Sequence, residues 1–71
     1  MVALGHIGSA EAMPLLVVAL GDTDPEVRYT AAVALGQIES SDAVPALAAA
    51  LASDSDEAVR RAVTWALGRI E

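Results

Sequence analysis

Few side chains of this sequence could do acid–base or metal chemistry, and the only histidine is His6. Zinc and iron sites gather several imidazole, thiolate or carboxylate ligands around one point, but the chain offers a single imidazole and no cysteine. Serine, histidine and acid do not occur at the spacing of an acyl-transfer site, and no glycine-rich loop follows a strand pattern. The sequence therefore predicts no catalytic residue, no metal and no cofactor.

Two acidic turns, residues 22–24 and 54–56, are the places where a calcium ion could be considered. Alternating acids begin calcium loops, but such a loop also needs a glycine and a distal glutamate to close the oxygen cage, and neither turn has them. Each turn instead precedes a helical pattern, where an acid caps the helix and offsets its dipole. The sequence predicts that Asp24 and Asp56 are helix N-caps.

The two capping acids begin two copies of one segment. Residues 24–38 read Asp-Pro-Glu-Val-Arg-Tyr-Thr-Ala-Ala-Val-Ala-Leu-Gly-Gln-Ile, and residues 56–70 read Asp-Glu-Ala-Val-Arg-Arg-Ala-Val-Thr-Trp-Ala-Leu-Gly-Arg-Ile. Ala-Leu-Gly also begins at residue 3, so the period is 31 and then 32 residues. Arg28 and Arg60 follow the capping acids by four residues. We expect each to pair with a capping aspartate and to hold neighbouring repeats together.

Each repeat reads as two helices. The first is expected at about residues 11–20 and 42–52, with Pro14 or Pro45 near the end of its first turn, where a missing amide hydrogen costs least. The second is expected at about residues 25–38 and 57–70, and residues 1–8 match the end of such a helix. The predicted fold is all-α, a single repeat domain over residues 1–71. It consists of the end of a preceding helix at 1–8 and helix pairs at 9–38 and 39–71.

The composition supports helices packed on helices. Apolar residues make up 55% of the 71 residues, yet Tyr29 and Trp65 are the only aromatic ones, so alanine, valine and leucine must build the core. A chain this short rarely buries enough apolar area to be comfortably stable alone, and repeats normally need three or more neighbours. We expect a fragment of a longer solenoid, or a chain that completes its core by self-association.

Charge and hydropathy narrow the range of partners. The net charge is −6, and the only basic side chains besides the histidine are four arginines. Because phosphate binding depends on clustered positive charge, neither a nucleic acid nor an acidic membrane surface is expected as a partner. No apolar run approaches the roughly 20 residues of a membrane span, and no basic stretch precedes an apolar one at the N-terminus. A cytoplasmic location is therefore expected.

The motif Asp-Pro-Glu-Val-Arg, followed by Ala-Leu-Gly-x-Ile and by Val-Pro-Ala-Leu at residues 44–47, resembles the short HEAT-like repeats of the phycobilin lyases. The resemblance covers essentially the whole chain. It implies antiparallel helix pairs stacked in a right-handed α-solenoid, with the second helices lining the concave face. Similar repeats occur in chromophore-attaching lyases, hydroxylases and scaffolds. Deoxyhypusine hydroxylase holds a di-iron centre with His-Glu pairs, but Ile7 follows His6 here, so the resemblance does not extend to that chemistry.

Differences between the two copies indicate where a partner would bind. At 100° per residue, matching positions lie on one arc of the second helix and differing positions centre on the opposite arc. Because stacked helices lie about 10 Å apart, the differing positions should form rows across the concave face, where aromatic and arginine side chains favour binding. The alternative for Trp65 is that it covers an adjoining helix. The predicted partner-binding residues are His6, Tyr29, Val33, Gln37, Arg61, Trp65 and Arg69.

The sequence thus favours a non-enzymatic module that binds or scaffolds a protein partner. The alternative is a repeat segment of a bilin lyase-like, chromophore-handling subunit, which would need a larger concave pocket and more repeats. Residues 13–20 are apolar on every side, whereas the matching residues 44–51 carry alanines at 46, 48 and 49. We therefore expect a homodimer that buries an exposed apolar edge of the first repeat, with closed two-fold symmetry.

Overall fold

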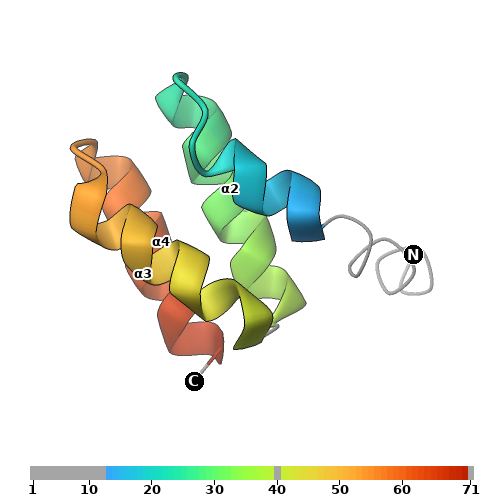
Figure 1. The fold of residues 1–71 in the computed structure, drawn as a ribbon. Helices are drawn as coiled ribbons and strands as arrows, with labels where there is room; N and C mark the ends of the chain where they lie inside the picture. Colours follow the sequence, from blue (N-terminus) through green and yellow to red (C-terminus); the bar gives the residue numbers. More distant parts are fainter. Residues whose placement is uncertain (1–12, 40, 71) are drawn as a thin grey trace.

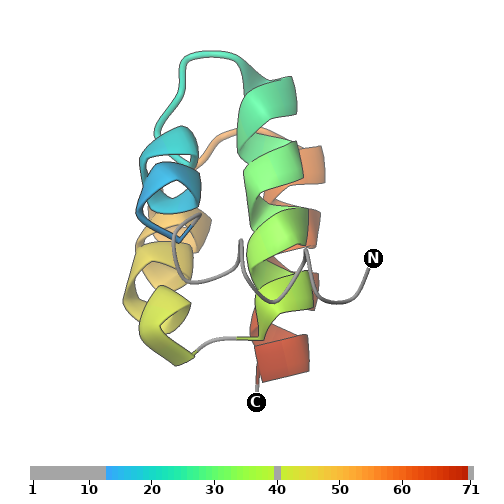
Figure 2. The same cartoon turned by 90° about the vertical axis from the view of Figure 1, so that its right-hand side faces the viewer.

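The computed structural model describes residues 13–39 and 41–70 and arranges them as helices in two layers (Figure 1). Residues 13–19 are helical, and they are followed by α2 (Pro25–Ile38), the short 3-10 helix η1 (Ser41–Ala43), α3 (Val44–Ser53) and α4 (Glu57–Ile70). Residues 13–19 and α3 form one layer, and α2 and α4 form the other (Figure 2). The all-α prediction is confirmed. The segment 1–8 and the start of the first helix lie outside the described residues, and the handedness of the superhelix stays a prediction.

Local signals explain where α2 and α4 begin and end. The Oδ1 atom of Asp24 accepts a hydrogen bond from the amide of Glu26 at 2.9 Å, and Asp24 has the extended backbone of an N-cap. The Oδ1 atom of Asp56 accepts from the amide of Val59 at 3.1 Å at the start of α4. The helix α2 ends because Glu39 adopts a left-handed backbone with φ 60° and donates its amide to the carbonyl of Leu35.

The start of α3 differs slightly from the expected residue 42. A turn of 3-10 helix, Ser41–Ala43, comes first, and the α-helix begins at Val44 with no side-chain cap. Pro45 gives a physical reason, because it has no amide hydrogen to bond the carbonyl four residues earlier, which is that of Ser41. The tighter 3-10 turn fits a segment in which the α-helical hydrogen-bond ladder cannot yet begin.

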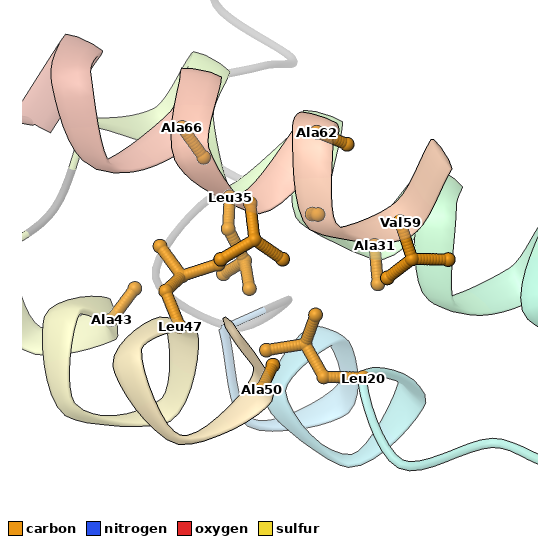
Figure 3. Packing of buried hydrophobic residues seen from close by; sticks show 11 residues of the cluster. Leu20, Ala31, Leu35, Ala43, Leu47, Ala50, Val59, Ala62 and Ala66 are labelled. Carbon is orange, nitrogen blue, oxygen red and sulfur yellow. The ribbon is translucent and has the colours of Figure 1, made fainter. Parts of the chain in front are cut away.

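The core lies between the two layers and is built mainly from small side chains. Leu35 of α2 and Leu47 of α3 are fully buried and point toward one another between the layers (Figure 3). Six of the eleven buried hydrophobic residues are alanines, which lets the helices approach closely. The buried hydrophobic residues are Leu20, Ala31, Ala32, Leu35, Ala43, Leu47, Ala50, Val59, Ala62, Val63 and Ala66.

An arginine joins the two repeats at the loop end of the molecule. The Nε atom of Arg28 lies 2.7 Å from Oδ2 of Asp54, in the loop before α4, and Nη1 donates to the carbonyls of Asp22 and Thr23 at 2.7 and 3.2 Å. The prediction that Arg28 pairs with the capping Asp24 is therefore wrong, because its partner is Asp54. The carboxylate of Asp24 is engaged with the first turn of α2, whereas Asp54 of the next repeat faces the guanidinium.

Arg60 does not repeat this contact with any residue that the structure describes. The pairing that we expected between Arg60 and Asp56 is absent from the described residues, because the Asp56 carboxylate caps α4 and the Arg60 side chain is exposed. Arg60 still acts on Asp54 at longer range. Burial raises the pKa of the Asp54 carboxyl group, the hydrogen bonds from Arg28 and from the amide of Asp56 outweigh burial and lower it, and the positive charge of Arg60 adds a smaller lowering.

Candidate partner-binding site

A groove runs along the outer face of the α2–α4 layer, between the two helices. Its volume is about 470 Å³. Tyr29 and Val33 contribute from α2, while Arg61 and Trp65 contribute from α4, so the structure brings together four of the residues that the sequence comparison selected. Ala58 and Ala62 complete the lining. We call these six residues the aromatic groove.

The aromatic groove is hollow because two of its residues are small. Ala58 is exposed and Ala62 is buried, and both line the groove from α4. Both alanines are at positions that differ between the two copies, but they were not among the predicted partner-binding residues. Their contribution to the groove is different, because a small side chain takes up little of its volume.

Trp65 is held in place by a close approach of α2 and α4. A Cβ atom built on Gly36 of α2 would lie 2.6 Å from Cζ3 of Trp65 and 2.9 Å from the Cα atom of Ala66. Only a glycine at this position leaves room for both the indole ring and the backbone of α4. The Trp65 side chain therefore lies against Gly36 on one side, yet 43% of the residue's surface stays exposed.

Arg69 extends the site by one turn of α4. Its Cζ atom lies 5.3 Å from the centroid of the Trp65 ring, within the range of a cation–π contact. Its Nη2 atom also lies 2.5 Å from Oε2 of Glu39, the residue that ends α2. Sequence analysis did not select Glu39, and the left-handed conformation that turns it toward Arg69 has no signal at this position, since glycine or asparagine is the usual residue there.

Arg61 and Tyr29 are also exposed members of the aromatic groove. The Nη2 atom of Arg61 lies 3.1 Å from Oε2 of Glu57 one turn earlier, and both side chains are more than three-quarters exposed. An ion pair in such contact with water contributes little to stability, so Arg61 can change partner at small cost. Tyr29 is 45% exposed. The groove therefore offers two partly exposed rings and, from α4, a readily available guanidinium.

Two of the predicted residues that the structure describes, Arg69 and Gln37, do not line the groove. Gln37 is exposed near the end of α2 and does not line it. His6 lies outside the described residues. Within residues 13–39 and 41–70, no three histidine, cysteine, aspartate or glutamate side chains are placed to hold a metal ion. None of the helices described in that part of the chain combines the length and the apolar character needed to cross a membrane.

A comparison with known protein families shows which type of helical repeat the chain contains. The model of the HEAT repeats matches residues 2–70. The chain belongs to the HEAT-repeat family. HEAT repeats are generally protein-interaction or scaffold modules, and the match is to HEAT repeats as a whole, so the phycobilin lyase subtype stays a prediction. A search of curated proteins found no significant match.

Proposed function

We propose that this HEAT-repeat chain is a protein-interaction module that holds a segment of another protein in the aromatic groove. The observation that carries the proposal is that Tyr29 and Trp65, the only aromatic residues, line one groove and are each more than 40% exposed. Exposed aromatic rings clustered on one face are costly to leave in water, and they are the side chains most often responsible for binding energy at interfaces.

The chemistry of the groove favours a partner with an apolar or aromatic side chain near an acid. The two rings and Val33 offer an apolar floor, while Arg61 can leave Glu57 to pair with a carboxylate of the partner. Trp65 needs little ordering on binding, because Gly36 and Arg69 already limit its movement. A short peptide with one bulky apolar residue flanked by aspartate or glutamate meets these requirements.

Trp65 itself supplies the readout for a test, because it is the only tryptophan. A displayed library of random peptides is selected on the folded chain, and the enriched peptides are titrated while Trp65 fluorescence is followed. We expect enriched peptides to share an apolar residue beside an acid and to lose at least tenfold in affinity with Tyr29→Ala, since removal of a hot-spot ring costs about 2 kcal/mol or more.

Two further variants make the peptide experiment specific. Trp65→Ala, followed by peptide anisotropy rather than protein fluorescence, should abolish binding while circular dichroism stays close to that of the parent chain. Thr64→Ala, which changes a neighbouring exposed residue outside the groove, should leave binding unchanged. Enrichment of peptides that bind equally well to the Tyr29 and Trp65 variants would exclude the groove. A bilin titrated in place of the peptide tests the chromophore-handling alternative by its visible absorbance.

A further inference from the structure

The contact between the two repeats uses one stripe of α2. Arg28, Ala32 and Gly36 follow one another at intervals of four residues and therefore lie on one side of the helix. This side faces the second repeat, because Arg28 reaches Asp54 and Gly36 lies against Ala66 of α4. Ala32 and Gly36 are buried, and the Arg28 side chain is only 18% exposed. We call these three residues the joint stripe.

α4 carries the same stripe, and none of residues 13–39 and 41–70 packs against it. Its residues Arg60, Thr64 and Gly68 are all exposed, and a Cβ atom on Gly68 would meet no atom within 4 Å. The guanidinium of Arg60 forms no ion pair or hydrogen bond with the described residues. The hydroxyl of Thr64 donates to the carbonyl of Arg60 at 2.9 Å, so its polar group is satisfied within α4 and its methyl group can face a partner.

At the opposite edge of the molecule, the first repeat exposes the surface that corresponds to the one on which the joint stripe packs in the second repeat. In the second repeat, Val59 is 1% exposed because it packs in the core shared with the first repeat. Its counterpart in the first repeat, Val27, is 37% exposed and borders an open groove of about 400 Å³. We call this the edge groove. Its lining residues are Leu16, Ala19, Asp24, Glu26, Val27, Thr30 and Ala31.

An acceptor for Arg60 also stands at this edge. Asp22 occupies the position of Asp54 one repeat earlier. Asp54 accepts the amide of Asp56 at 2.9 Å, and Asp22 accepts the amide of Asp24 at 2.8 Å, so the two loops orient their carboxylates by the same hydrogen bond. Asp54 additionally receives Arg28, whereas within the described residues the carboxylate of Asp22 forms no ion pair.

We propose that a second copy of this chain stacks head-to-tail on the first. The stripe of Arg60, Thr64 and Gly68 in one copy packs on the edge groove of the next, and Arg60 pairs with Asp22. The contact continues the joint that already exists between the two repeats, with the same charges and the same helix faces. Because the two surfaces differ, stacking leaves a free edge at each end and does not stop at two chains, in contrast to a closed two-fold dimer.

Gly68→Gln is the cleanest test, because a Cβ atom at this position has open space around it and glutamine favours a helix. Sedimentation velocity of the full chain, from micromolar to millimolar concentration, should show the parent mass rising beyond two chains. The Gly68→Gln variant should stay at the mass of one chain throughout that range, with unchanged circular dichroism. A parent chain that keeps the mass of one chain at millimolar concentration overturns the proposal.

Exchanging the charges tests the pairing of Arg60 with Asp22. Arg60→Asp and Asp22→Arg should each weaken self-association by about tenfold or more, because like charges then face one another. An equimolar mixture of the two variants should associate again, since each contact in an alternating stack joins opposite charges. Arg61→Asp changes the net charge equally but lies in the aromatic groove, and it should leave the assembly unchanged. If Asp22→Arg fails to fold, the loss of self-association in Arg60→Asp and in Gly68→Gln remains as the test.

Other occupants of these surfaces give different results. Leu15 and Val18 are 73% and 74% exposed and could form a symmetric contact instead. Assembly that ends at two chains and is dissolved by Leu15→Glu with Val18→Glu, but not by Gly68→Gln, overturns the head-to-tail arrangement. Assembly that depends on Leu4 and is unaffected by the Gly68 variant assigns the edge groove to residues 1–8 and overturns it as well.

Discussion

Gly36 and Gly68 occupy the same position of the two repeats, yet their surroundings differ. Gly36 lies where α2 touches α4, and an added methyl group would lie 2.6 Å from the Trp65 ring and 2.9 Å from the Cα and Cβ atoms of Ala66. The side chain could yield, but the backbone of α4 cannot move without opening the core. A methyl group added to Gly68 would instead lie in open space, with no atom within 4 Å. Close packing therefore requires a glycine at position 36. Nothing among the described residues requires one at position 68.

This contrast gives a prediction for a matched pair of variants. Gly36→Ala should lower the free energy of unfolding by about 1–3 kcal/mol, because the clash outweighs the gain in helix propensity. Gly68→Ala should raise it by as much as ~1 kcal/mol, from helix propensity alone. Urea unfolding followed by circular dichroism at micromolar concentration measures both, and equal stabilities of the two variants would contradict the prediction.

The helices α2 and α4 could be predicted well from the sequence, because the signals that start and end them are local. A capping aspartate or a proline stands at each start, and the apolar pattern between is regular. The partner of Arg28 could not be predicted in this way, because Asp54 lies 26 residues away and only the packing of the repeats brings it near. The groove could be predicted in part. Comparing the two copies selected its large side chains as binding residues and found its alanines only as differing positions, and it gave no signal for Glu39.

The loop carrying Asp54 couples the stability of the α2–α4 layer to pH. Burial of Asp54 by itself raises the pKa of its carboxyl group, but the hydrogen bonds from Arg28 and from the amide of Asp56 outweigh it, and the pKa lies below its ordinary value. A lowered pKa in the folded state stabilises the fold at any pH above the unfolded pKa of about 4, and that contribution is lost as the pH falls through the folded value.

Asp54→Asn should therefore unfold at a lower temperature than the parent chain at pH 7, and its melting temperature should fall less steeply as the pH drops below about 4. Asp22→Asn is the matched control at the same position of the first repeat, and it leaves the ion pair between Arg28 and Asp54 in place. Thermal unfolding by circular dichroism at a series of pH values measures both variants. Parallel curves for the parent chain and Asp54→Asn would show that the pair does not link stability to pH.

The core of the molecule is thin and consists mostly of alanine, so the stability of the fold depends on a few larger side chains. Leu35, Leu47, Val59 and Val63 are the largest fully buried residues. A folded domain of this length is stable by only about 4–10 kcal/mol at typical values per residue. The loss of one large buried side chain therefore removes a substantial part of the total.

Leu47→Ala should lower the free energy of unfolding by about 2–5 kcal/mol, because it leaves a cavity between the layers. Leu15→Ala deletes the same atoms from a side chain that is 73% exposed, and it should change stability by no more than about 0.5 kcal/mol. Both values come from urea unfolding at a concentration where the chain is a monomer. A small effect of Leu47→Ala would mean that the layers can close around the missing side chain.

The joint between the repeats and the aromatic groove use different arcs of the same two helices, and this separation bears on how such chains change over generations. Gene duplication of one repeat would add a helix pair that already carries its arginine, its glycine and its receiving aspartate, so the new unit fits its neighbour without further mutation. The positions of Tyr29, Val33 and Arg61 are then free to diverge, since they take no part in the pairing of Arg28 with Asp54 or in the close approach at Gly36, whereas Trp65 lies against Gly36 and is constrained by it. Lengthening the protein and altering what it recognises are thus separate evolutionary steps at three of these four positions.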